Sequence, residues 1–479
     1  MNKVADTFII NYQGNNILYD SLLNISSISD ENLSQLENEQ YDNILKKNGF
    51  LHTLEDNKKS IENDYLPNSA TIIPTLGCNF SCTYCFSTPS RKEQYLEIEK
   101  ATAAIDYIVD NSIKKNKRTK LVIHGGGEPL TATDLVVEIS KYFRSVCKEK
   151  NVKGSVLLCT NGFASEKNLD LIKDTIDIVQ ISCDGPEQSH DSQRVTVNGQ
   201  KTYKTVLGTI DYFENNKIPY IIRTTVTQNN LHSLNQWVES LKERELLRIL
   251  HLEPFLENST SKSNGLSKVK SNDFFDIYVS IDKTLLDSNI KLTYSGCSER
   301  LIKTEFCNIS NHFILTPEGI VTSCLESIDS NCDNSDIFIL GSIDAENKID
   351  INKEKQSFLT QRKSLNIEAC SKCIAKFKCA GDCSKNCAGR TGDIMTIGES
   401  YRCDINRSIS VYNILKSCGL LNGECSYVKI QSAIIKTATN IGSNEKKLAF
   451  INNNNENPDC KSCSHENDTG CEAFGEEEE

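Results

Sequence analysis

The chain has 479 residues, 21 cysteines and a formal net charge of −12 at pH 7. This length predicts two to four domains, and the acidic charge argues against an electrostatic grip on nucleic acid or an anionic membrane surface. Because the sequence lacks a run of about 18 apolar residues and a secretion signal, we expect a cytoplasmic protein whose clustered thiols bind metal rather than pair as disulfides.

The first 68 residues predict a small α+β unit. Short strands are expected over residues 7–12 and 17–19, with a hairpin turn at residues 14–16 between them. A helix is expected over residues 29–49, which begin with capping residues and end in Asn-Gly. A unit of this size is too small to be catalytic by itself.

Strands and helices alternate from Ala70 onward. Strands are predicted at Thr71–Ile73, Lys120–His124, Ser155–Leu158, Ile178–Ile181, Tyr220–Val226 and Arg248–Leu252, with helices such as 97–114 and 134–148 between them. Six such units predict an α/β fold over residues 69–290, with a parallel sheet closed or partly closed into a TIM-like (β/α)6 barrel. Chemistry in such barrels lies on loops at the carboxyl ends of the strands.

The remaining chain changes character. Residues 258–271 are polar and predict a loop, and residues 291–425 are turn-rich and close with a helix over residues 402–418. Residues 426–479 predict a flexible acidic tail. The tail carries Cys460, Cys463 and Cys471, which can recruit metal, donate thiols to a redox partner, or belong to a fused substrate-like segment.

The first cysteine cluster follows the first barrel strand. Cys78, Cys82 and Cys85 have the spacing C-x3-C-x2-C. Three cysteines on one loop can hold three irons of a [4Fe–4S] cube and leave the fourth iron open to a small molecule. A zinc site, which wants four ligands, and unrelated buried thiols are the alternatives.

This segment resembles the radical SAM superfamily over residues 70–255. The resemblance implies that the open iron chelates S-adenosylmethionine. It further implies that one electron from the cluster, supplied by a flavodoxin- or ferredoxin-type reductant, cleaves the sulfonium. The products would be methionine and a 5′-deoxyadenosyl radical that removes a hydrogen atom from substrate. The protein supplies placement and exclusion of water.

The same resemblance assigns cofactor-binding residues on the loops after the strands. Glycines of the Gly-Gly-Glu motif let the backbone approach the ligand, and the glutamate carboxylate or nearby carbonyls can accept hydrogen bonds from the methionyl ammonium. The serine and arginine are donors for the methionyl carboxylate, the tyrosine matches the aromatic position beside adenine, and the asparagine either binds cofactor or caps a turn. These residues are Tyr84, Gly126, Gly127, Glu128, Asn161, Ser182 and Arg194.

The later cysteines resemble the seven-cysteine SPASM extension of radical SAM enzymes, with a pair of zinc sites as the alternative. The resemblance implies two auxiliary [4Fe–4S] clusters, hence three clusters in all. The distal cluster would be held by Cys370, Cys373, Cys379 and Cys403, and the inner one by Cys307, Cys324 and Cys383. Cys297 is our choice for an eighth ligand, with Cys332, Cys387 or an open iron as alternatives.

Two smaller expectations concern the same region and the barrel. Residues 316–319 are predicted as a turn between two short strands that bring Cys307 and Cys324 together. The thiols of Cys147, Cys159 and Cys183 are expected in the barrel core.

The resemblance also points to a substrate class, because SPASM enzymes mostly modify peptides or proteins. Residues 1–68 resemble the precursor-recognition unit of peptide maturases, which can pair a strand edge with a leader peptide; a structural collar is the alternative. The leading hypothesis is maturation of a ribosomally made precursor peptide, with leader and core, by a thioether or carbon–carbon cross-link.

Two rival functions remain. Anaerobic sulfatase-maturing enzymes carry an Asp base directly after the cysteine that corresponds to Cys324, where this chain has Leu325 and then Glu326, a candidate base. Their two inner-cluster cysteines are also closer than Cys297 and Cys307. A non-catalytic iron–sulfur electron carrier would need neither the Gly-Gly-Glu motif nor the carboxylate donors.

Overall fold

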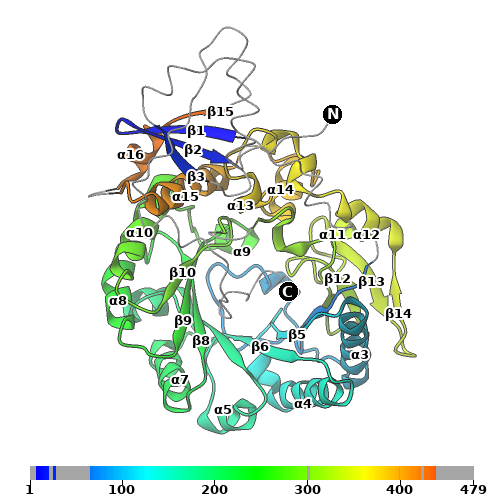
Figure 1. Ribbon diagram of the computed structural model, residues 1–479. Helices are drawn as coiled ribbons and strands as arrows, with labels where there is room; N and C mark the ends of the chain where they lie inside the picture. Colours follow the sequence, from blue (N-terminus) through cyan, green and yellow to red (C-terminus); the bar gives the residue numbers. More distant parts are fainter. Residues whose placement is uncertain are drawn as a thin grey trace.

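The computed structural model describes residues 7–20, 25–28, 65–298, 302–398, 400–421 and 425–437. These residues form an eleven-stranded sheet and a four-stranded sheet, and Figure 1 shows the four-stranded sheet above the other. None of the helices within these ranges is long and apolar enough to cross a membrane.

The barrel is built from parallel strands that pair in sequence order. They are β4 (Ser69–Ile72), β5 (Thr119–Ile123), β6 (Gly154–Thr160), β7 (Ile178–Ser182), β8 (Tyr220–Val226), β9 (Leu247–Pro254) and β10 (Lys291–Thr293). The six predicted strands are therefore confirmed. The short strand β10 adds to them, and pairs with β9 beyond the expected domain end at residue 290.

Helices cover the outer face of this sheet (Figure 1). They are α3 (Ile98–Lys115), α4 (Thr133–Glu149), α5 (Glu166–Ile172), α6 (Glu187–Gln193), α7 (Tyr203–Asn215), α8 (Leu234–Leu241) and α10 (Ser271–Thr284). In α3 the buried residues Ala101, Ala104, Ile105 and Ile108 recur every three or four positions and so share one face. The thiols of Cys147, Cys159 and Cys183 are buried, as predicted.

The cysteine-rich region begins as an extension of the barrel sheet. Strand β11 (Ile314–Leu315) pairs in parallel with β4, and β12 (Ile320–Thr322), β13 (Ile339–Ile343) and β14 (Ile349–Ile351) continue antiparallel. The turn predicted at residues 316–319 joins β11 to β12, with Gly319 at a φ of +80°. The sheet is therefore an open barrel that ends in the cysteine-rich region.

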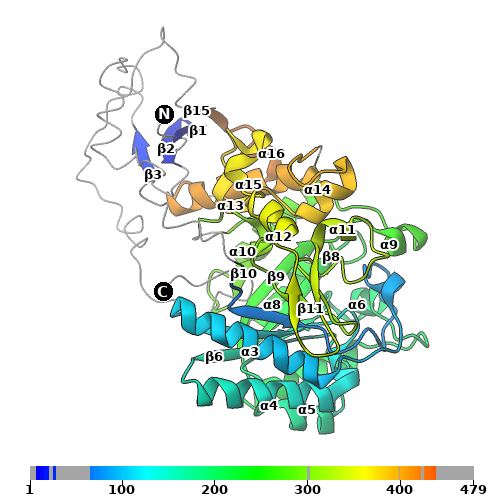
Figure 2. The same ribbon diagram turned by 90° about the vertical axis from the view of Figure 1, so that its right-hand side faces the viewer.

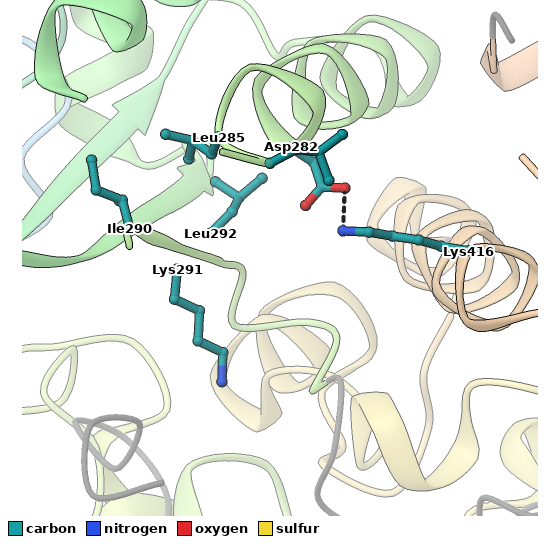
Figure 3. A pocket seen from close by; sticks show the side chains of 7 residues that line it. Asp282, Leu285, Ile290, Lys291, Leu292 and Lys416 are labelled. Carbon is teal, nitrogen blue, oxygen red and sulfur yellow. Dashed lines mark hydrogen bonds and ion pairs between the residues drawn. The ribbon is translucent and has the colours of Figure 1, made fainter. Parts of the chain in front are cut away.

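Helices complete this region. They are α11 (Ser335–Phe338), α12 (Lys353–Thr360), α13 (Lys376–Cys379), α14 (Ser384–Thr391) and α15 (Tyr401–Ser417). Helix α15 corresponds to the predicted closing helix and packs on α10, where Asp282 accepts from Tyr412 at 2.6 Å and pairs with Lys416 at 2.7 Å. A cavity of about 200 Å³ opens beside this ion pair (Figure 3).

The second sheet joins the two ends of the described chain. Its order is β15 (Ile434–Thr437), β1 (Thr7–Tyr12), β2 (Asn15–Asp20) and β3 (Ile25–Ile28). In Figure 2, β15 lies beside β1 and β2, and this sheet lies above the barrel. The β1–β2 turn is formed by Gln13 and Gly14, both with positive φ, so Asn15 already belongs to the strand.

Two expectations about loops and tails are wrong. The tail expected from residue 426 instead begins with α16 (Tyr427–Gln431) and β15, because residues 434–437 find a pairing partner in β1. The polar segment 258–271 contains the short helix α9 (Ser259–Ser263), which Asn258 starts with a capping box. The predicted helix over 29–49 and the tail cysteines lie outside the described residues.

Candidate active site

The three cysteines of the first motif lie together on the loop after β4. Burial raises the pKa of the Cys82 thiol to about 12; Arg194 lowers that pKa, and negative charge on Cys85 and Cys78 raises it. The backbone N–H of Phe80 donates to Cys78 Sγ at 3.4 Å. The predicted grouping of these thiols is therefore present in the fold.

The Gly-Gly-Glu loop after β5 is bonded directly to the cysteine loop. Gly127 N donates to Thr75 O at 3.2 Å, and Glu128 N donates to Gly77 O at 2.8 Å. A Cβ atom on Gly127 would lie 2.6 Å from the carbonyl carbon of Gly77 and closer still to its oxygen. Only glycine permits this approach of the two backbones.

Glu128 has a role that the sequence did not predict. Its carboxylate is 2% exposed and accepts hydrogen bonds from Leu130 N at 3.0 Å, Thr160 Oγ1 at 2.6 Å and Asn161 N at 2.6 Å. Burial raises the pKa of this carboxyl group, and the three hydrogen bonds act in the opposite direction. The carboxylate thus connects the loops that follow β5 and β6.

Asn161 continues this chain of contacts. Its Nδ2 donates to Asn79 Oδ1 on the cysteine loop at 2.8 Å, and its Oδ1 accepts from Phe163 N at 2.9 Å. The side chain therefore caps a turn, one of the two roles expected for it, and also contacts the cysteine loop.

Tyr84, Asp184 and Arg194 form a buried polar group on the other side of the cysteine loop. The Tyr84 hydroxyl donates to Asp184 Oδ2 and accepts from Arg194 Nη1, the latter at 2.6 Å. Ser182 ends β7, two residues before Asp184. Arg194 Nε is buried and has no hydrogen-bond partner among the described residues.

That unpaired donor tests whether the site fits S-adenosylmethionine. Buried polar atoms are nearly always hydrogen-bonded, so this guanidinium N–H is available to donate to a bound group. A carboxylate is the natural acceptor for arginine. Arg194 thus fits the predicted role of binding the methionyl carboxylate. Its charge also lowers the pKa of Cys82, which places it close to the cysteine loop.

The seven later cysteines separate into the two predicted groups. In the inner group, Cys383 is buried deeply enough to raise the pKa of its thiol well above normal, and charges on Glu326, Cys324 and Cys307 raise it further. In the distal group, burial raises the pKa of Cys370 to about 12, with further contributions from Cys373 and Cys403. Cys379 is also near Cys373, Cys403 and Cys370.

The candidates for an eighth ligand are spread more widely. Cys297 Sγ lies 3.4 Å from Ser410 Oγ on α15, and Cys332 Sγ lies 3.7 Å from Ser90 Oγ near the first cysteine loop. Cys387 packs in an apolar cluster with Cys370 of the distal group. The choice of Cys297 and the open-iron alternative both stay predictions.

The thiols of each group lie near one another but do not converge on a single point. Within the described ranges, no three Cys, His, Asp or Glu side chains are placed to hold a single metal ion. A [4Fe–4S] cube takes each thiolate on a different iron, so its ligands need not converge on one point.

Several charged residues of the site escaped the sequence analysis. Arg91 Nη2 donates to Cys85 Sγ at 3.2 Å and its Nη1 donates to Phe80 O. Glu253 at the end of β9 pairs with Arg402 of α15 at 2.6 Å. The only available signal was that Arg402 directly precedes Cys403, and a lone charge beside a cysteine predicts no particular contact.

Comparisons with known proteins agree with this architecture. Residues 72–241 match a family model described as "Radical SAM superfamily". The cysteine-type anaerobic sulfatase-maturating enzyme of Clostridium perfringens is 24% identical over 280 residues, covering 54% of this chain and 74% of that enzyme. The radical SAM cyclopropyl synthase TigE of Paramaledivibacter caminithermalis is 21% identical over 360 residues, covering 68% of this chain and 70% of TigE.

Two solved structures share the fold. Native anSMEcpe with bound AdoMet and Cp18Cys peptide has a TM-score of 0.56 at 20% identity, covering 73% of this chain and 96% of that one. Streptococcus suis SuiB bound to S-adenosylmethionine has a TM-score of 0.51 at 14% identity, covering 82% and 98%. The fold predicted from sequence is therefore confirmed.

The close contact between Gly127 and Gly77 predicts that a larger residue at Gly127 will impair the site. Because a methyl group at Gly127 would displace the cysteine loop, G127A should lower reductive cleavage of S-adenosylmethionine by about 100-fold, the scale of a misplacement near 1 Å. Production of 5′-deoxyadenosine by the anaerobic, reconstituted protein measures this. G208A in α7, where a Cβ atom meets nothing within 4 Å, is the matched control and should keep full cleavage.

Proposed function

Because the chain contains a radical SAM domain, we propose that it is a peptide maturase that binds three [4Fe–4S] clusters and S-adenosylmethionine and cross-links a ribosomally made precursor. One observation carries the proposal: the first three thiols, the Gly-Gly-Glu loop and the unpaired Arg194 donor meet at the carboxyl edge of the sheet. That edge is where barrel enzymes assemble their active sites.

The bound cofactors would supply the 5′-deoxyadenosyl radical, and the chain would supply placement. Cys78, Cys82 and Cys85 would hold the first cluster, while Arg194 and Ser182 donate to the methionyl carboxylate. Tyr84 is fixed by Asp184 at the position proposed beside adenine.

A peptide substrate is supported by the relatives and by the N-terminal sheet. The anSMEcpe structure holds a peptide together with AdoMet. In this chain β15 covers one side of β1, so the two terminal strands of the described sheet are β15 and β3. A leader peptide pairing with β3 would extend the sheet by backbone hydrogen bonds.

The proposed product is a thioether or a carbon–carbon bond. Forming either bond removes two hydrogen atoms from the peptide. One goes to the 5′-deoxyadenosyl radical, and the other leaves as a proton and an electron, for which the auxiliary clusters are the proposed acceptor. Ten thiols in three groups are consistent with such a role.

Formylglycine formation is the second candidate, favoured by the similarity to sulfatase-maturating enzymes. Glu326 lies beside Cys324, Cys307 and Cys383, near the place where that family carries its base. An electron carrier is the weaker rival, because it would bind no S-adenosylmethionine carboxylate to accept the hydrogen bond of Arg194 Nε.

Replacing the first three thiols tests the central assignment. The C78A/C82A/C85A variant should lose 5′-deoxyadenosine formation with S-adenosylmethionine and dithionite and hold about eight irons, against about twelve in the parent, because each cube contains four. Anaerobic iron analysis and product chromatography measure both quantities. Cleavage that survives the triple substitution, or a preparation that holds only zinc, would contradict the proposal.

Proline substitution tests the leader site on β3. Ser26 and Ser27 lie opposite Leu18 and Ile17, and successive N–H groups of a strand point to opposite sides, so only one of the two donates outward. S26P and S27P should differ: the proline that removes the outward N–H should weaken peptide binding at unchanged stability, and the other should lower the melting temperature. Equal peptide affinity in both variants would contradict peptide pairing at β3 and favour a purely structural role for this sheet.

Glutamine at Glu326 tests that residue as the base, and the mass of the parent's product separates the two candidate products. If Glu326 is a base for substrate, E326Q should lower peptide modification by about 100-fold and spare uncoupled S-adenosylmethionine cleavage. Mass spectrometry distinguishes a loss of two hydrogens from an aldehyde trapped by a hydrazide. Trapped aldehyde in the parent protein would establish formylglycine formation instead.

A further inference from the structure

Arg402 makes polar contacts with both the barrel and the cysteine-rich region. The side chain is 2% exposed. Its Nε donates to Asp382 Oδ1 at 2.8 Å, its Nη1 to Glu253 Oε1 at 2.6 Å and its Nη2 to Ser295 Oγ at 3.1 Å. Each nitrogen of the guanidinium group therefore has a different partner.

Arg402 and its two carboxylate partners belong to three different parts of the protein. Glu253 is in the barrel strand β9, and Asp382 directly precedes Cys383 of the inner thiol group. Arg402 itself directly precedes Cys403 of the distal group. The guanidinium carbon also lies 5.9 Å from the ring centroid of Phe306, which precedes Cys307. One cation thus contacts the neighbours of both thiol groups.

The contact between Arg402 and Glu253 is an ion pair between two buried, charged side chains. Burial raises the pKa of Glu253, but the charge of Arg402 and a hydrogen bond from His251 outweigh it, and the net pKa lies well below normal. Glu253 is therefore ionised near neutral pH. Charges interact strongly at such a site, since little water screens them.

We propose that Arg402 is a positioning residue that sets the reduction potentials of both auxiliary clusters from one place, an inference that rests on the proposed function. Reducing a cluster adds negative charge, and a nearby buried cation stabilises that state. Net charge and hydrogen bonding around a cluster are the means by which a protein adjusts its potential. The carboxylates of Glu253 and Asp382 act in the opposite direction and hold the cation in place.

A purely structural brace is the competing explanation, since buried ion pairs can fix a fold without adjusting a cofactor. The two explanations differ in the sign of the effect. Loss of the cation and loss of its barrel carboxylate would disturb a brace in the same way. They would move the potentials in opposite directions if charge is what matters.

The experiment is an EPR-monitored redox titration of the full-length, anaerobically reconstituted protein. R402Q should lower the auxiliary midpoint potentials and E253Q should raise them, each by at least a tenfold change in the one-electron equilibrium, about 59 mV. The S-adenosylmethionine-binding cluster serves as internal reference and should not move. K173Q at the end of the barrel helix α5 removes an exposed cation paired with Asp170, and should shift nothing because water screens that charge.

The outcomes separate this proposal from the proposed function. Shifts in the same direction, or no shift, in protein that holds about twelve irons overturn the role of Arg402 and leave the cluster assignment standing. Protein that holds only about four irons overturns both. If R402Q does not fold, E253Q decides alone, and an unchanged or lowered potential in that variant overturns the proposal.

Discussion

The backbone contact between the loops after β4 and β5 is the constraint on which the site depends. Neighbouring parallel strands end at the same edge of the sheet, so the cysteine loop and the Gly-Gly-Glu loop must share one small space. Gly127 lets them touch, and the Glu128 N–H fixes their distance by bonding Gly77 O at 2.8 Å. Through its carboxylate, Glu128 carries that constraint on to Asn161 and the third loop.

The cysteine-rich region is held to this site by backbone pairing and by charge. Strand β11 pairs with β4, the strand whose loop carries Cys78, so the two regions share one continuous sheet. On the other side, Glu253 of β9 reaches Arg402 of α15. These two connections hold the cysteine-rich region against the barrel edge.

The sequence predicted what depends on local spacing and missed what depends on distant pairing. Buried strands such as β8 are continuous apolar runs, and cysteine spacings such as C-x3-C-x2-C are complete within one loop, so both could be recognised. Strand β15 could not be predicted, because its four residues form a strand by pairing with β1, where Asn11 lies opposite Ile434, about 420 positions away in the sequence. The Arg402 contacts have the same cause.

The barrel and the thiol groups do not by themselves choose between the two product classes, because relatives of both kinds share this fold. The distinction must come from the part of the chain that meets substrate first. In the N-terminal sheet β15 covers one side of β1, so β15 and β3 are the two edges of the described sheet where an extended peptide could pair. Such pairing uses backbone groups rather than particular side chains. Recognition of that kind suits an extended leader whose backbone is read, and it leaves the residues to be modified free to reach the barrel edge.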